Sequence, residues 1–214
     1  MNNERTFIVG DIHGCLDMLK RMMEKIQWQP EKDNLIFLGD YIDRGEDPKG
    51  VVDYILTLQK SSSRIQCLLG NHEAIFLDYL SGRDKRLFLL NGGYNTLESY
   101  DSGREGSDRL IPEDHLAFYE SLKTYCELEN YYVVHAGFKP GIPILEQDRE
   151  DMVWIRDPFI FSSHDFGKRV IFGHTPFSEP LVLANKIGLD TGAVYGNKLT
   201  CLELPEFIFH ATEA

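Results

Sequence analysis

Short apolar runs, each followed at once by a glycine or histidine and a polar turn, recur along the chain. An apolar run closed in this way is typical of a buried strand. The runs occupy residues 7–9, 35–38, 67–69, 132–134 and 170–172. The pattern therefore predicts strands whose carboxyl ends carry polar side chains. In α/β sheets, that edge is where active sites lie.

Apolar residues at helical spacing fill the intervals between the first three runs. Residues 15–27 predict one helix, and Asp47 followed by Pro48 opens a second helix that runs to about Lys60. A third helix is expected over residues 72–80. This alternation of strands and helices predicts parallel strands joined by right-handed crossovers, and therefore an α/β fold.

The second half of the chain is less regular. Residues 82–111 are rich in glycine and in charges of both signs, which favours a surface excursion. A helix is expected over 112–125, with His115 on its solvent side, and residues 136–167 are expected to be loop-rich. The last part predicts short strands that suit antiparallel meanders, at 168–172, 180–183, 186–189, 198–204 and 206–210.

Length and charge narrow the possible function classes. The 214 residues can form one domain, 1–214, with a sizeable core. The net charge of −12 disfavours binding to duplex nucleic acid, which needs a basic surface. No apolar run approaches the ~20 residues that cross a membrane, no apolar signal segment is visible, and the four cysteines are scattered. We therefore expect a cytoplasmic protein without a membrane partner, whose oligomeric state stays open.

The polar turns collect side-chain types that bind divalent ions. Carboxylate, imidazole and amide oxygen together suit manganese, iron, zinc or cobalt, and the absence of cysteine argues against a structural zinc site. The set exceeds what one ion with an open position needs, so two ions about 3.5–4 Å apart fit better. Any one such residue is more often a helix cap or a satisfied polar group, but folding alone does not explain the whole set. The candidates are Asp11, His13, Asp40, Asp43, Arg44, Asn71, His72, His135 and His174.

The order of these turns resembles a known family. The set G-D-I-H-G, G-D-Y-I-D-R-G, G-N-H-E, H-A-G and G-H-T spans residues 10–175. It resembles the phosphoprotein-phosphatase branch of the calcineurin-like metallophosphoesterases, in particular its bacterial and phage serine/threonine phosphatases. The resemblance implies a central β-sandwich of mixed sheets flanked by helices, with a dimetal site at one edge.

The resemblance also implies a role for each residue. His72 would protonate the leaving oxygen and would be oriented by Asp43. Arg44 would bind phosphate oxygens. Arg156 would be a second phosphate-binding arginine or, alternatively, a surface residue paired with Asp157. The implied ligands are Asp11, His13 and Asp40 for one ion, and Asp40, Asn71, His135 and His174 for the other.

The implied activity is that of a dimetal phosphomonoesterase in which a metal-bridging hydroxide attacks phosphorus directly. The favoured interpretation is a serine/threonine protein phosphatase that also accepts phosphotyrosine. It would use two divalent ions, with manganese ahead of iron, zinc or cobalt, and its partner would be a phosphorylated protein or a small phosphoester. The alternative is a nucleotide hydrolase, such as a symmetric diadenosine tetraphosphate hydrolase. A third interpretation is a scaffold of the same fold without turnover.

Two departures from the family pattern concern the substrate side. Eukaryotic members usually have arginine where this chain has Leu69, and their longer C-terminal part supplies a substrate-side tyrosine that this chain is too short to provide. Substrate choice is expected to depend on residues 82–111 and 136–167. The cations hypothesised to steer a second anionic group are Arg83, Lys85, Arg86 and Arg104.

Overall fold

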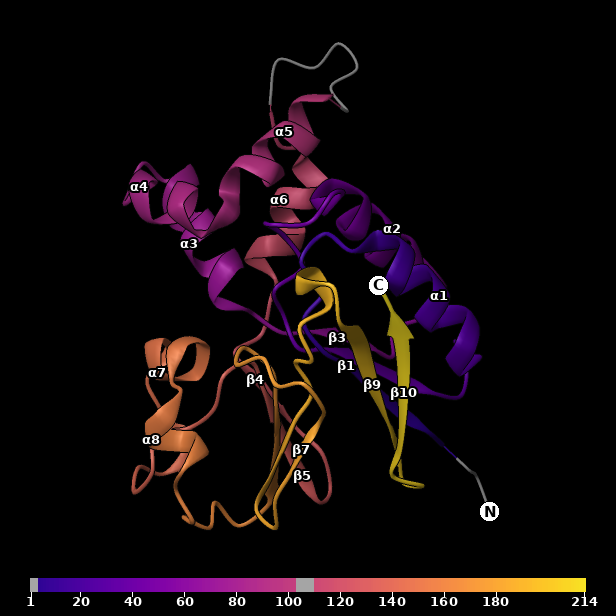
Figure 1. Ribbon diagram of the computed structural model, residues 1–214, viewed down its shortest axis with the longest axis vertical. Coiled ribbons are helices and arrows are strands. Elements are labelled where there is room, and N and C mark those ends of the chain that lie inside the picture. The colour runs from indigo at the N-terminus through magenta and orange to yellow at the C-terminus, as the bar shows by residue number, and fades with distance from the viewer. Residues whose placement is uncertain (1–3, 103–109) are drawn as a thin grey trace.

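Two five-stranded sheets stand at the centre of the protein, whose computed structural model describes residues 4–102 and 110–214 (Figure 1). The strand order is β10-β9-β1-β2-β3 in the first sheet and β4-β5-β6-β8-β7 in the second. Each sheet contains both parallel and antiparallel pairs. The predicted α/β fold with a sandwich of mixed sheets flanked by helices is confirmed.

The first sheet contains the predicted parallel strands. β1, β2 and β3 run parallel, while β9 pairs antiparallel with β1 and with β10. The strands are β1 (Thr6–Val9), β2 (Asn34–Phe37), β3 (Ile65–Cys67), β9 (Lys198–Leu204) and β10 (Ile208–Glu213). The carboxyl ends of the parallel strands therefore meet at one edge, where the polar turns follow.

The second sheet differs from the expected antiparallel meander. β6 pairs parallel with both β5 and β8, and only β4 and β7 at its edges are antiparallel to their neighbours. The segment between β5 and β6 contains three short helices and crosses over instead of turning back, and β8, not β7, lies beside β6. The strands are β4 (Tyr125–Glu127), β5 (Tyr131–Val134), β6 (Arg169–Phe172), β7 (Leu181–Val182) and β8 (Lys186–Gly188).

Helices cover the outer faces of both sheets. In Figure 1, α1 and α2 lie beside the first sheet and α7 and α8 beside the second. No helix within the described residues is long and apolar enough to cross a membrane. The helices are α1 (Leu16–Ile26), α2 (Pro48–Ser61), α3 (Asn71–Leu80), α4 (Lys85–Phe88), the π-helical η1 (Leu89–Gly93), α5 (Tyr94–Ser102), α6 (Glu113–Glu120), the 3-10 helix η2 (Ile144–Glu146), α7 (Arg149–Trp154), α8 (Asp157–Ile160) and the 3-10 helix η3 (Ala193–Tyr195).

Alternation along the central strands builds two cores at once. Phe7 and Val9 of β1 face α1 and α2, whereas Ile8 between them packs against residues of the second sheet such as Ile171. This is the two-residue period of a strand whose two faces are both covered. The sheets are thereby joined by an apolar layer directly beneath the edge that carries the polar turns.

The helix predicted over 112–125 is shorter than expected. α6 ends at Glu120, because the residues after it pair with strands from both sheets. The backbone N–H of Lys123 donates to Cys67 (3.1 Å), and the Lys123 carbonyl accepts from Leu69 (2.7 Å). The prediction that His115 faces solvent is wrong, because its side chain is buried and its ring nitrogen contacts the Tyr100 hydroxyl.

The described part of the expected excursion at 82–111 is helical. It forms α4, η1 and α5, and it buries Phe88, Thr96 and Tyr100. Phe88 packs on Phe76 of α3, which fixes this segment against the body of the protein. Residues 103–109, and with them the hypothesised cation Arg104, lie outside the described residues.

Candidate metal centre and catalytic site

The polar turns meet at the edge of the sandwich where β1, β2, β5 and β6 end. The backbone N–H of His174 donates to Asp11 Oδ2 (2.9 Å), and His135 Nδ1 donates to the carbonyl of Leu38 (3.0 Å). These bonds join turns of the second sheet to turns of the first. The predicted site residues are therefore close in space although they span more than 160 positions of sequence.

One group of ligand atoms surrounds the first oxygen of Asp40. His135 Nε2 lies 3.4 Å from Asp40 Oδ1. The side-chain oxygen of Asn71 lies 3.1 Å from His135 Nε2 and 2.8 Å from His174 Nδ1. All four side chains are buried. This is the set that the resemblance implied for one of the two ions.

A second group surrounds the other oxygen of Asp40. His13 Nε2 lies 3.4 Å from Asp40 Oδ2. Asp11, predicted to complete this group, is buried, and its Oδ1 atom has no hydrogen-bond partner. A Cβ on Gly173 would collide with that same oxygen, so the glycine keeps the space beside it open. The two carboxylate oxygens of Asp40 thus face two different ligand groups.

Burial lowers the pKa of the histidines in both groups, which favours neutral imidazoles. His13 Nδ1 donates to the carbonyl of Ile42 (2.9 Å), which leaves Nε2 unprotonated, and Arg44 donates to that nitrogen (2.7 Å). Burial lowers the pKa of His13 to about 3, and burial together with His135 lowers the pKa of His174 to about 2. Burial opposes ionisation of Asp40, but His135 and the other histidines hold its pKa well below the usual range. Neutral imidazoles around an ionised carboxylate are the protonation states that metal binding requires.

The donor set fits two divalent ions. It combines neutral imidazole, carboxylate and amide oxygen, which suit borderline to hard cations. An orphaned buried carboxylate oxygen on Asp11 is costly unless a cation satisfies it. Asp40, with one oxygen toward each group, is suited to bind both ions at once.

The backbone of these turns is strained. Among the described residues, positive φ angles at residues other than glycine are rare, and five of the eight lie in this site. Such conformations persist only where the surroundings over-determine them, and they concentrate at functional sites. The five residues are His13 (45°), Asp40 (52°), Asp43 (70°), Arg44 (67°) and His174 (64°).

His72 and Asp43 form a buried pair beside the metal ligands. The distance from His72 Nδ1 to Asp43 Oδ2 is 2.6 Å, and both side chains are almost fully buried. The imidazole also lies close enough to Asp40 and His13 to be a ligand candidate. Its bond to Asp43 distinguishes it from them, because an imidazole that donates from Nδ1 to a carboxylate is oriented for proton transfer at Nε2.

A cavity of about 150 Å³ opens over this cluster. Arg44 and Arg156 both line it, together with His72. Arg156 Nη1 donates to the hydroxyl of Thr175 (3.3 Å), next to His174. The cavity is smaller than the roughly 300–1,000 Å³ of pockets for drug-sized ligands. Two guanidinium groups in so small a space suit a compact anion such as a phosphate group.

Sequence reasoning gave no role to Glu73, the last residue of G-N-H-E. Its carboxylate accepts backbone N–H groups from Asp40 (2.9 Å), Tyr41 (2.8 Å) and Gly70 (3.1 Å). It therefore fixes the turn that carries Asp40. The available signal was its place three residues after Gly70, the N-cap of α3, where a glutamate commonly caps the helix.

Two further cavity residues, Asp190 and Tyr195, were also missed. Asp190 follows β8 just as the ligands follow their strands, and burial raises its pKa to about 6. Tyr195 of η3 lies with its ring 5.7 Å from the guanidinium of Arg44. A tyrosine therefore lines this cavity from within the described chain, because η3 follows β8 by only a few residues.

The hypothesised steering cations lie elsewhere. Arg83 pairs with Asp78 (2.5 Å), and Lys85 and Arg86 are exposed on α4. None of these described cations lines the cavity.

Comparison with known proteins identifies two kinds of relative. The chain is 30% identical over 205 residues to serine/threonine-protein phosphatase 1 of Salmonella typhimurium, covering 93% of this chain and 91% of the relative. It is 27% identical over 224 residues to the asymmetrical bis(5'-nucleosyl)-tetraphosphatase PrpE of Bacillus thuringiensis, covering 93% and 90%. The nucleotide-hydrolase relative is thus of the asymmetrical type, whereas the sequence analysis named the symmetric type.

Solved structures share the fold of this chain. A putative diadenosine tetraphosphatase superposes with a TM-score of 0.76 at 23% identity, covering 100% of this chain and 96% of the other. A Saccharomyces cerevisiae serine/threonine phosphatase superposes with a TM-score of 0.72 at 15% identity, covering 100% and 81%. The family model for calcineurin-like phosphoesterases matches residues 4–204, and this chain therefore belongs to that family of phosphoester hydrolases.

Proposed function

We propose that this chain is a metal-dependent phosphomonoesterase that removes phosphate from phosphoserine and phosphothreonine in proteins, and also from phosphotyrosine. The observation that carries the proposal is the buried pair of His72 and Asp43 at the rim of a small cavity lined by Arg44 and Arg156. We take residues 1–214 as one metallophosphoesterase domain. We also propose a cytoplasmic location, because all four cysteines are free thiols.

Two divalent ions would be held by the two ligand groups around Asp40, and manganese is our first choice. Asp11, His13 and Asp40 would hold one ion, and Asp40, Asn71, His135 and His174 the other. Ions bound there would neutralise phosphate charge and acidify water. The protein would hold these ligands in place, because the strands that carry them pack on one common apolar layer.

His72 would act at the leaving oxygen. Water attacks phosphorus and loses one proton to solvent, the bond from phosphorus to the leaving oxygen breaks, and the proton on His72 Nε2 moves to that oxygen. A serine or threonine alkoxide is a poor leaving group, so this proton transfer is worth about 10²–10⁴ in rate. Asp43, buried against Nδ1, stabilises the protonated imidazole and fixes its direction.

Arg44 and Arg156 would bind the oxygens that do not react. Arg44 comes from the turn after β2 and Arg156 from the junction between α7 and α8, and both line the same small cavity. Guanidinium groups bind phosphate oxygens in a bidentate fork and stabilise the charge of the transition state. With water as the nucleophile, no phosphoenzyme forms.

Hydrolysis of dinucleoside polyphosphates is the second candidate. It is favoured by the relatives named as asymmetrical bis(5'-nucleosyl)-tetraphosphatases. A groove of about 800 Å³, also lined by Arg44, runs beside α1 and is large enough for a group beyond the phosphate. The groove suits a peptide as well as a nucleoside, so it does not decide between the two substrates.

Initial rates of the manganese-reconstituted protein would test the proposal. The substrates are phosphoserine, phosphothreonine and phosphotyrosine peptides beside diadenosine tetraphosphate, and His72→Asn is assayed with each. We expect the peptides to be preferred and their turnover to fall about 10²–10⁴-fold in the variant. Preference for the dinucleotide would favour the second candidate. Absence of turnover of either, with metal bound, would leave a scaffold without activity.

A further inference from the structure

The segment formed by η1 and α5 packs directly on the turn that carries Asp43 and Arg44. The backbone N–H of Arg44 donates to the carbonyl of Gly92 (3.3 Å), and the side chain of Asn95 donates to the carbonyl of Arg44 (2.8 Å). Thr96 lies one residue further along α5 and is fully buried. This segment therefore supports the side of the catalytic turn that faces away from the strands.

Thr96 makes two hydrogen bonds to Asp43. Its hydroxyl accepts the backbone N–H of Asp43 (3.0 Å) and donates to Asp43 Oδ1 (2.5 Å). A hydroxyl has one proton to donate and two lone pairs to accept with, so Thr96 can make both of these hydrogen bonds at the same time. It leaves Asp43 Oδ2 to accept from His72 Nδ1 (2.6 Å). The carboxylate is thereby held at both oxygens and cannot rotate away from the imidazole.

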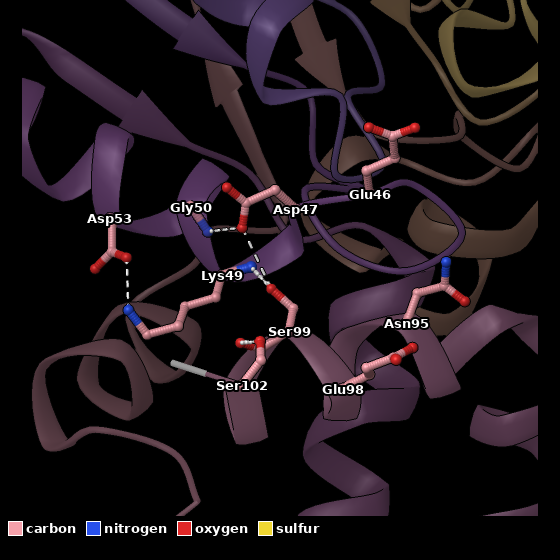
Figure 2. A pocket seen from close by; sticks show the side chains of 9 residues that line it. All are labelled: Glu46, Asp47, Lys49, Gly50, Asp53, Asn95, Glu98, Ser99 and Ser102. Atoms are coloured by element: carbon pink, nitrogen blue, oxygen red, sulfur yellow. Dashed lines mark hydrogen bonds and ion pairs between the residues drawn. The ribbon is translucent and has the colours of Figure 1, made fainter. Parts of the chain in front are cut away.

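The helix that carries Thr96 is itself anchored. Ser99, almost one turn further along α5, accepts the backbone N–H of Lys49 (3.1 Å) and donates to Asp47 Oδ1 (3.3 Å) at the start of α2. Figure 2 shows Ser99 pointing at these two residues. The Tyr100 hydroxyl lies 2.7 Å from His115 Nδ1, which ties α5 to α6. Thr96 is thus presented to Asp43 by a helix fixed on two sides.

We propose that Thr96 is a positioning residue for the reaction: it fixes the carboxylate of Asp43 so that the imidazole of His72 points its Nε2 proton at the leaving oxygen. The inference rests on the proposed function. Asp43 has a left-handed backbone and is buried, so it depends on these partners more than an exposed aspartate would. A support of this kind is what keeps a catalytic side chain within the narrow range of productive geometry.

Leaving-group dependence separates this role from a general structural one. Thr96→Val keeps the shape of the side chain and removes the hydroxyl, whereas Thr96→Ser keeps the hydroxyl. We expect Thr96→Val to lower kcat on a phosphoserine peptide by roughly 10- to 100-fold, and p-nitrophenyl phosphate, whose leaving group needs no proton, to be nearly unaffected. Thr96→Ser should recover most of the loss. Ser99→Ala loosens the same helix without touching the pair and serves as the matched control, expected to show no such selectivity.

A double-mutant cycle tests the path through Asp43. If Thr96 acts through that carboxylate, Thr96→Val should cause no further loss of kcat in an Asp43→Asn background. Equal losses in both backgrounds would overturn the inference. So would a loss in Thr96→Val that is the same for both leaving groups. Should Thr96→Val not fold, Thr96→Ala, which removes atoms and cannot clash, takes its place.

A spectroscopic readout separates failure of this inference from failure of the proposed function. The Nδ1 proton of His72, hydrogen-bonded to Asp43, can be followed by NMR in the metal-free protein without any turnover. We expect its resonance to shift in Thr96→Val and to return in Thr96→Ser. An unmoved resonance would overturn the role of Thr96. A moved resonance, together with a His72→Asn variant that shows no leaving-group selectivity, would overturn the acid role of His72 instead.

Discussion

Glu73 lies behind the metal centre and binds backbone groups instead of an ion. Its Oε1 accepts from Tyr41 (2.8 Å) and Ile42 (3.3 Å), and its Oε2 accepts from Asp40 (2.9 Å) and Gly70 (3.1 Å). Burial and the charge of Asp40 raise the pKa of Glu73, and the N–H groups oppose that shift. Each carboxylate oxygen of Glu73 thus accepts from two backbone N–H groups. A side chain with a hydrogen-bond donor at this position would face other donors.

Glu73→Gln should therefore destabilise the protein. In either orientation the amide NH₂ would face two backbone N–H groups, and we expect the free energy of unfolding to fall by about 1–3 kcal/mol. Urea denaturation of the metal-free protein measures this. The control is Glu46→Gln, the same change at an exposed position. Its free energy of unfolding should stay within about 0.5 kcal/mol of the wild-type value. Equal midpoints for both variants would show that the backbone contacts of Glu73 contribute nothing.

At the scale of elements, the strands bring together the residues that the sequence predicted as metal ligands. Asp11, Asp40 and His135 lie within three residues of a strand end, and the strand fixes where such a residue goes. Thr96 and Tyr195 reach the site on helices from distant parts of the chain, and no local pattern marks them. His115 was misplaced for the same reason, since its burial depends on Tyr100 from the segment expected to be a surface excursion.

The helical segment above the site contains a glycine that tests its role. Gly92 has φ of 100°, and a Cβ there would lie 2.8 Å from Arg44 Cγ. Gly82 has φ of 83°, but open space surrounds its Cβ position. Alanine at either position strains the backbone by about 1–2 kcal/mol. Only the first substitution also pushes on Arg44, the arginine proposed to bind phosphate.

Gly92→Ala should therefore lower kcat/KM by roughly 10- to 100-fold, because a displaced catalytic group loses rate steeply with distance. Gly82→Ala should lose similar backbone stability and keep its kcat/KM. Thermal unfolding and steady-state kinetics of the two variants make the comparison. A Gly92→Ala enzyme as active as Gly82→Ala would mean that the segment does not hold Arg44 in its working position.

For the whole molecule, the candidate metal centre also lies at the junction between the two sheets. Asp11, His13 and Asp40 follow strands of the first sheet, and His135 and His174 follow strands of the second. Ions bound by both sets would clamp the open edge of the sandwich. The chain also carries a net charge of −12, so bound cations would reduce its self-repulsion.

Removal of the ions should therefore lower the melting temperature. An ion present at 100 times its dissociation constant stabilises the folded state by about 2.7 kcal/mol. A second bound ion would stabilise the folded state further. Differential scanning calorimetry after chelation and dialysis, and again after addition of manganese, measures the shift. Asp40→Asn is the decisive variant, because Asp40 faces both ligand groups, so its replacement should remove most of the manganese-dependent rise. Magnesium at the same concentration controls for screening of the net charge.

A full manganese-dependent shift of the melting temperature in Asp40→Asn would place the stabilising ions away from these turns and would contradict the shared-ligand arrangement. Loss of that shift would tie the stability of the sandwich to the carboxylate proposed to bridge the two ions.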